Sequence, residues 1–164
     1  MKRLLIITGP QGSGNHLFSR ILSATKTVGG WKSLLDKYWV PSDEEPFAEY
    51  WVDPTKLTAE VFEHKDYHMA NVSCPFFFDG VRYVPKILEV ARRAKHLGVD
   101  VQIAIIVRDQ NINQLQQLRV RKQHTTPIAQ EYYYNNLMRS EFPVHFLDHE
   151  AFFLHREHYV RWVG

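Results

Sequence analysis

Apolar runs and amphipathic stretches alternate along the chain, and this pattern predicts strands and helices in turn. The mainly apolar runs are short, as expected for strands that are buried on both faces of a sheet. They occupy Leu4–Thr8, Tyr67–Ser73, Val101–Val107 and Phe142–Leu147. Apolar residues at helical spacing occupy Leu17–Ser23, Thr58–His64, Val84–Leu97, Asn111–Lys122, Pro127–Met138 and Glu150–Val163. This order favours a three-layer α/β fold, with a mostly parallel sheet flanked by helices.

Two of the predicted helices have a clear apolar side. In Val84–Leu97 it consists of Ile87, Leu88, Ala91, Ala94 and Leu97. In Asn111–Lys122 it consists of Ile112, Leu115 and Leu118. We therefore expect both helices to be buried on these sides. Gly98 follows the first of the two and predicts its end, because glycine readily adopts the left-handed conformation of a helix C-terminus.

The segment from Thr25 to Asp53 is the least regular part of the chain. It predicts a short helix around Ser33–Tyr38, followed by a loop that contains an acidic turn. Acceptor-recognition segments and ordinary surface insertions both have such irregular sequences, so both interpretations stay open for residues 25–57. The whole chain, residues 1–164, is expected to form a single domain.

Charge and cysteine content narrow the class of protein. The net charge is only +2 with neutral histidines, so it does not indicate nucleic acid as a partner, although it leaves one possible. The single cysteine, Cys74, excludes an intramolecular disulfide framework and fits a reducing cytoplasm. No stretch approaches the roughly 20 apolar residues of a membrane span. We expect a cytoplasmic protein without a membrane partner, and its oligomeric state stays open.

The stretch Gly9–His16, GPQGSGNH, joins the first predicted strand to the first predicted helix. Glycines let the backbone turn tightly, so that several N–H groups and the positive end of the helix converge on one anion. The spacing is that of a P-loop, but Asn15 and His16 replace the usual lysine and Ser/Thr. Main-chain donors remain, so the loop predicts a nucleotide site; the alternative is a tight connection between strand and helix that binds no ligand. Its residues are Gly9, Gln11, Gly12, Ser13, Gly14 and Asn15.

Ligands of parallel α/β sheets bind beyond the carboxyl ends of the strands. Three loops are expected at that edge, and they are Gly9–His16, Ser73–Pro75 and Arg108-Asp109. Arg108 would pair with a second phosphate or, alternatively, form a structural ion pair with Asp109 or a neighbour. Arg119 and Arg121 would form a cationic lid over the nucleotide or, alternatively, a solvated helix end.

Two histidines are candidates for the catalytic base. His16 stands on the first turn after the loop, where the helix dipole favours the neutral imidazole that a base needs; the alternative is that it only caps the helix or packs. His68 lies inside a predicted strand, where core packing is the alternative. The remaining cluster, at 145, 149, 155 and 158, does not place four ligands on one face of a single element. We therefore expect no metal site there.

The order and character of these pieces resemble the P-loop sulfotransferase family. The phosphosulfate loop of that family, G-x-x-[KR]-[ST]-G-[TS]-[TS], is similar to Gly9–His16. A later strand of the family ends in Arg-Asn-Pro or Arg-Asp-Pro, which is similar to Ile105–Gln110, IIVRDQ. The family often ends with a Tyr-Glu-Asp-Leu turn and Phe-Leu-Gly, to which Phe146–Phe152 and Arg161–Gly164 are similar.

The sequence departs from that family at three places. Gly12 replaces a basic residue, Gln116 stands where a serine holds the 3′-phosphate, and Ser73–Pro75 stands where many members have His-Leu-Pro with a catalytic histidine. The resemblance implies transfer of a sulfo group from 3′-phosphoadenosine 5′-phosphosulfate to a hydroxyl or amine of a small-molecule or nucleotide acceptor. The loop would then hold the 5′-phosphate and the transferred group, and Arg108 the 3′-phosphate.

Two other functions stay open. The first is a degenerate P-loop kinase for a nucleotide, a nucleic-acid base or a small molecule. It would use ATP with Mg²⁺, and Arg119 and Arg121 would compensate for the missing lysine. The second is a P-loop protein that binds a nucleotide or a protein partner and catalyses no reaction.

Overall fold

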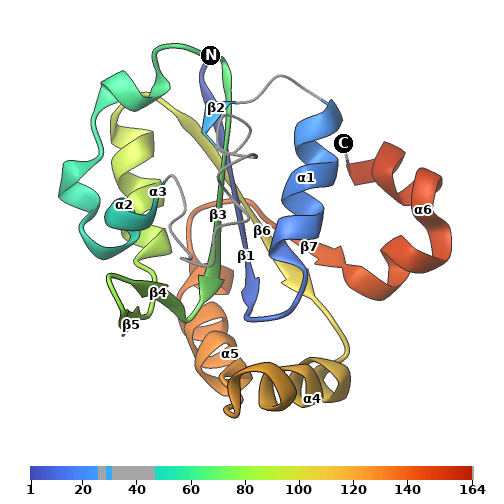
Figure 1. Cartoon of the computed structure of the whole chain (residues 1–164). Helices are drawn as coiled ribbons and strands as arrows, with labels where there is room; N and C mark the ends of the chain where they lie inside the picture. Colours follow the sequence, from blue (N-terminus) through green and yellow to red (C-terminus); the bar gives the residue numbers. More distant parts are fainter. Residues whose placement is uncertain (26–28, 31–46, 164) are drawn as a thin grey trace.

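The computed structural model describes residues 1–25, 29–30 and 47–163 of the chain. Its centre is a five-stranded sheet of order β2-β3-β1-β6-β7, in which every neighbouring pair is parallel. The strands are β1 (Arg3–Pro10), β2 (Gly29–Gly30), β3 (Tyr67–Cys74), β6 (Asp100–Val107) and β7 (Val144–Asp148). Helices cover both faces of the sheet (Figure 1), which confirms the predicted three-layer α/β fold.

The helices form the two outer layers and one lobe beyond the sheet (Figure 1). On one face lie α1 (Asn15–Thr25) and α6 (His149–Val163), and on the other lie α2 (Ala48–Val52), α3 (Ile87–His96) and α5 (Thr126–Asn135). Helix α4 (Gln110–Arg121) lies beyond the carboxyl ends of the strands. Short 3₁₀ turns occupy Pro54–Lys56, Ala59–Phe62 and Leu137–Arg139. Among the described residues, no helix is long and apolar enough to cross a membrane.

The sheet separates two hydrophobic cores, because successive residues of a strand point to opposite faces. Leu4 and Ile6 of β1 belong to the larger core, which α2, α3 and α5 cover. Ile7 belongs to the smaller core, where it packs with Phe18 of α1 and Leu147 of β7. Strand β1 is therefore buried on both faces, as its continuous apolar run predicts.

The strands that the sequence predicts are all present, but parts of the helical pattern differ. The stretch 58–64 forms only a 3₁₀ turn, and the helix expected around 33–38 lies outside the described residues. Helix α2 stands where a loop was expected. A small antiparallel hairpin, β4 (Phe76–Phe78) and β5 (Val81–Tyr83), follows β3 and turns at Asp79-Gly80, where both residues have positive φ.

The prediction for the buried side of α4 is wrong. Ile112, Leu115 and Leu118 are 49%, 68% and 45% exposed, and the buried side chains of the helix are those of Asn113 and Gln117. The reason is the place of the helix: α4 lies beyond the strand ends, so its neighbour is a polar loop rather than the apolar face of the sheet.

The strand order places the glycine loop at a switch point of the sheet. From β1 the chain continues to β3 on one side, and after β3 it crosses to β6 on the other side of β1. The connections on the two sides of β1 therefore diverge at its carboxyl end and leave a crevice there. The loop that follows Pro10 occupies this position.

Candidate functional site

The loop after β1 exposes main-chain donors. Gly12 and Gly14 have φ of +85° and +104°, which only glycine adopts without strain. The Ser13 amide is used within the loop, where it donates to the Pro10 carbonyl at 3.0 Å. Within the described part of the chain, the amides of Gly12, Gly14 and Asn15 donate to no protein acceptor. These three donors at the start of α1 are available to an anion.

Asn15, at the position of the usual lysine, ties the loop to the neighbouring strand. Its side-chain amide donates to the Val72 carbonyl at 3.2 Å and to Ser73 Oγ at 3.3 Å. Its Oδ1 accepts a hydrogen bond of 2.8 Å from Ser13 Oγ. The side chain is buried and neutral, so it holds the loop in place but supplies no positive charge to a ligand.

Helix α4 supports the loop from below through buried amides. Gln117 Nε2 donates to the Gln11 carbonyl, and Gln117 Oε1 accepts from the Thr125 amide at 2.8 Å. Thr125 Oγ1 in turn donates to Gln11 Oε1 at 3.1 Å. All three residues are buried, so these contacts satisfy polar groups that water does not reach.

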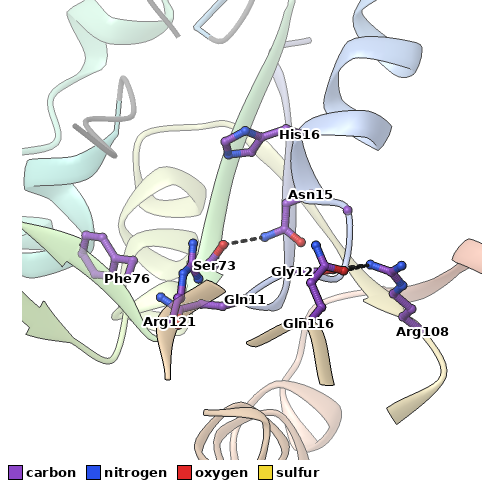
Figure 2. A pocket seen from close by; sticks show the side chains of 10 residues that line it. Gln11, Gly12, Asn15, His16, Ser73, Phe76, Arg108, Gln116 and Arg121 are labelled. Atoms are coloured by element: carbon purple, nitrogen blue, oxygen red, sulfur yellow. Dashed lines mark hydrogen bonds between the residues drawn. The ribbon is translucent and has the colours of Figure 1, made fainter. Parts of the chain in front are cut away.

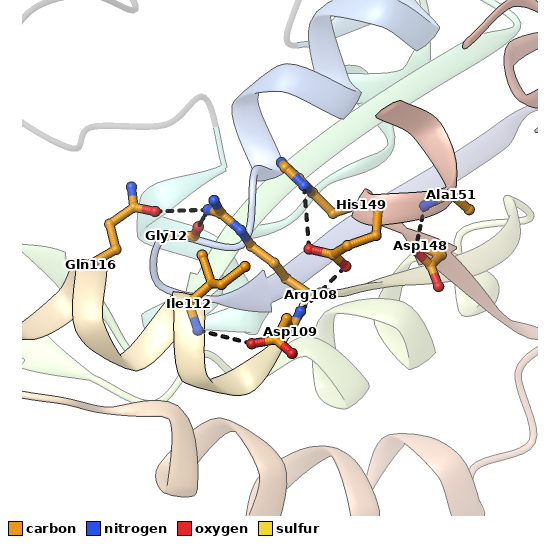
Figure 3. A network of polar contacts seen from close by, with 9 residues as sticks. Gly12, Arg108, Asp109, Ile112, Gln116, Asp148, His149 and Ala151 are labelled. Carbon is orange, nitrogen blue, oxygen red and sulfur yellow. Dashed lines mark hydrogen bonds and ion pairs between the residues drawn. The ribbon is translucent and has the colours of Figure 1, made fainter. Parts of the chain in front are cut away.

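Arg108, at the end of β6, contacts the loop directly (Figure 3). Its Nη1 donates to the Gly12 carbonyl at 2.6 Å and to Gln116 Oε1 at 2.7 Å. Asp109 does not pair with it: Asp109 caps α4 by accepting from the Ile112 amide at 2.9 Å. The alternative interpretation of Arg108, an ion pair with Asp109, is therefore not what the structure contains.

His149, the first residue of α6, packs behind the loop. A Cβ atom on Gly14 would lie 2.8 Å from His149 Cδ2, so the two residues fit only because position 14 has no side chain. Burial, and then the nearby Arg108 guanidinium, lower the pKa of His149. Its Nδ1 lies 3.8 Å from a carboxylate oxygen of Glu150, whose other oxygen accepts from the Asp109 amide at 3.3 Å (Figure 3).

These elements surround a cavity of about 270 Å³ above the loop (Figure 2). The charged side chains in its lining are the guanidinium groups of Arg108 and Arg121, and no described carboxylate lines it. The polar lining is completed by amides, a hydroxyl and an imidazole. The lining residues are Gln11, Gly12, Gly14, Asn15, His16, Ser73, Phe76, Arg108, Gln116 and Arg121.

Most of the residues predicted for the site gather here, and the rest are elsewhere. Gly9 lies under the loop, where any side chain would collide with Ser13 Oγ, and Ser13 is itself buried. Arg119 is exposed and does not line the cavity. His68 lies at the opposite, amino end of β3, with its ring 5.0 Å from that of Phe62. Burial lowers its pKa, and the structure does not bring it to the site.

Sequence reasoning did not place three of the contributing side chains at this site. Phe76 comes from a hairpin that the pattern did not predict, and Gln117 was not considered. His149 was considered only as a metal ligand. The buried polar positions of α4, Asn113 and Gln117, lie one helical turn apart, and this spacing is the one signal that could have indicated a polar inner side.

No protein-family model matches the chain, and no curated protein matches its sequence. Among solved structures, mouse sulfotransferase SULT7A1 in complex with PAP superposes with a TM-score of 0.52 at 9% identity, over 99% of this chain and 58% of that one. A gluconokinase from Sinorhizobium meliloti 1021 gives a TM-score of 0.44 at 10% identity, over 89% and 82%. The chain thus spans 58% of the sulfotransferase's length. The chain shares the α/β fold of the sulfotransferase at low sequence identity.

Proposed function

We propose that the chain is a sulfotransferase-like enzyme, which binds 3′-phosphoadenosine 5′-phosphosulfate in the cavity and transfers its sulfo group to a hydroxyl or amine. One observation carries the proposal: the cavity combines available loop amides with the guanidinium of Arg108, and no described carboxylate lines it. Such a lining neutralises an anionic donor without a metal ion. The fold of the PAP-bound mouse sulfotransferase is consistent with this function.

The residues have separate roles in this proposal. The amides of Gly12, Gly14 and Asn15 bind the 5′-phosphate and the transferred group, and Arg108 binds the 3′-phosphate. The acceptor oxygen or nitrogen attacks sulfur, the bond between sulfur and the bridging oxygen breaks, and that oxygen leaves with its electron pair on PAP. The imidazole of His16 takes the acceptor proton, because it lines the cavity next to the loop.

The lining of the cavity fits Mg²⁺-ATP poorly, and we therefore prefer the sulfotransferase proposal to the kinase alternative. Mg²⁺ prefers carboxylate and hydroxyl oxygens, and His16 occupies the position of the usual Ser/Thr ligand. Among the described residues, no group of three or more His, Cys, Asp and Glu side chains could hold a metal ion. Nothing in the site favours a second function by a specific contact.

Calorimetric titration with PAP and, separately, with ATP tests the proposal. We expect PAP to bind equally well with Mg²⁺ and with a chelator, and more tightly than ATP in either condition. Preference for ATP that depends on Mg²⁺ would make the chain a kinase instead. Binding of neither nucleotide would contradict the proposed site as a whole.

Two variants connect the binding to the proposed residues. Arg108→Gln removes a charge-assisted contact, so PAP affinity should fall about 10- to 100-fold. Arg139→Gln is the matched control, because Arg139 is exposed and its guanidinium lies over the Tyr134 ring, outside the cavity.

His16→Gln should retain PAP binding but lose transfer of a labelled sulfo group to a panel of phenols, alcohols and amines. Retained transfer would remove His16 from the mechanism.

A further inference from the structure

Arg121 is the second cation in the lining of the cavity, and the proposed donor site gives it no role. It lies at the C-terminal end of α4 and lines the cavity, and among the described residues it has no ion-pair partner. Arg108, the other cation, already donates to the Gly12 carbonyl and to Gln116. The charge of Arg121 is therefore available to a ligand.

The position of Arg121 is fixed by its neighbours on the helix. One turn before it, Gln117 connects α4 to the Gln11 carbonyl and to the Thr125 amide. Directly after it, Lys122 ends the helix in the left-handed conformation, with its amide bonded to the Leu118 carbonyl at 3.0 Å. These contacts fix the end of α4 that carries Arg121 relative to the loop.

Arg121 lies in a different part of the cavity from Arg108 (Figure 2). In the view of Figure 2, Arg121 is drawn on the side of Ser73 and Phe76, and Arg108 is drawn on the other side, with Asn15 between them. Ser73 supplies a hydroxyl, and Phe76 supplies an aromatic ring in contact with Tyr83, at a centroid distance of 6.0 Å. The lining of the cavity thus includes a hydroxyl and the edge of a buried aromatic ring in addition to Arg121.

The local charge favours an anion on this side. From Gln110 to Gln130 the chain has no acidic residue, although it has three basic ones, Arg119, Arg121 and Lys122. No described carboxylate lines the cavity to compete for Arg121. An arginine in such surroundings pairs with carboxylate or phosphate oxygens, often through two parallel hydrogen bonds.

We propose that Arg121 binds an anionic group of the acceptor, so that the acceptor is a hydroxyl or amine compound that also carries a carboxylate or a phosphate. This inference rests on the proposed function, because only a transferase has an acceptor. It differs from the expectation that Arg121 holds the nucleotide, because the donor side of the cavity has its own cation in Arg108. Arg119 does not line the cavity, which makes it the matched control on the same helix.

The experiment compares three phenols that carry an anionic or a neutral group opposite the hydroxyl. Binding of 4-hydroxybenzoate, 4-hydroxyphenyl phosphate and the neutral 4-hydroxybenzamide is measured by calorimetry at pH 7.5, with the protein saturated with PAP. The wild-type chain should bind at least one anionic probe about five- to tenfold more tightly than the amide. The better of the two anions identifies the group that the acceptor carries. Arg121→Gln should remove the preference, and Arg119→Gln should keep it.

Three results would overturn the inference. They are equal binding of charged and neutral probes by the wild-type chain, a preference that survives in Arg121→Gln, and equal losses in both variants. PAP affinity is measured in the same variants and should stay within about twofold of wild type. A large loss of PAP affinity in Arg121→Gln, with the probe preference intact, would assign Arg121 to the donor instead.

Failure of the proposed function can be distinguished from failure of this inference. If the wild-type chain binds no PAP, the probes are titrated without it. A preference that depends on Arg121 would then support an anion site in a chain that is not a sulfotransferase. Absence of any preference in that titration would contradict both proposals.

Discussion

Helices α3 and α4 follow similar apolar patterns but bury opposite kinds of side chain. Helix α3 buries Ile87, Ala91 and Ala94 against the sheet, as its pattern predicts. It also buries Val90, which the prediction did not include, while Leu88 and Leu97 are only partly buried. Helix α4 leaves its apolar side exposed and buries Asn113 and Gln117. The difference comes from the partner: α3 meets an apolar sheet face, whereas α4 meets a loop whose carbonyls need donors. Buried polar side chains thus distinguish α4, the helix that packs against the loop of the site.

The largest predicted difference in the free energy of unfolding is between a substitution at an apolar position of α3 and one at an apolar position of α4. Val90→Asn places an amide in the core, and we expect a loss of about 3 to 5 kcal/mol in the free energy of unfolding. Leu115→Asn, at a position that is 68% exposed, should change it by less than about 0.5 kcal/mol. Urea unfolding measures both values. If Leu115→Asn destabilised the chain as strongly as Val90→Asn, the apolar side of α4 would be buried and the comparison would fail.

A smaller effect is expected from the polar inner side of α4. Gln117→Leu leaves the Gln11 carbonyl and the Thr125 amide without their partner, which should cost about 1 to 3 kcal/mol. Because the loop loses its support, PAP affinity should also fall, by about tenfold. Gln110→Leu is the control, since Gln110 is exposed on the same helix. Unchanged stability and affinity in Gln117→Leu would show that α4 does not position the loop.

The sequence predicted what depends on local chemistry. The glycine loop and the strand β1 were predicted because backbone freedom and continuous apolar runs are properties of neighbouring residues. The side that α4 buries could not be predicted, because it depends on a loop about a hundred residues earlier in the chain. The sequence already made His68 the weaker candidate of the two histidines, and the structure places His16 in the cavity lining and His68 at the opposite, amino end of β3.

The smallest expected effect concerns the two buried histidines, His149 behind the loop and His68 at the other edge of the sheet. Burial lowers the pKa of both, so the unfolded chain takes up protons first as the pH falls. Their contribution to stability is complete above the unfolded pKa of about 6.5 and is lost as the pH falls through the folded pKa. We expect a lower urea midpoint at pH 5.5 than at pH 7.5.

Carboxylates also take up protons as the pH falls, so variants are needed to isolate the contribution of the histidines. His149→Gln should reduce the difference between the two midpoints, since the imidazole that resists protonation is gone. His155→Gln is the control, because His155 is exposed on the same helix. An equal difference in wild type and His149→Gln would contradict a buried, neutral His149.

The most direct test of the account is an amide NMR titration of the labelled chain with PAP, in the absence of Mg²⁺. The central claim is that the loop amides bind an anion while α4 and Arg108 hold the loop in place. We predict that the largest chemical-shift changes occur at the amides of Gly12, Gly14 and Asn15, with smaller changes along α3. If PAP bound and these three amides kept their shifts, the claim would be wrong.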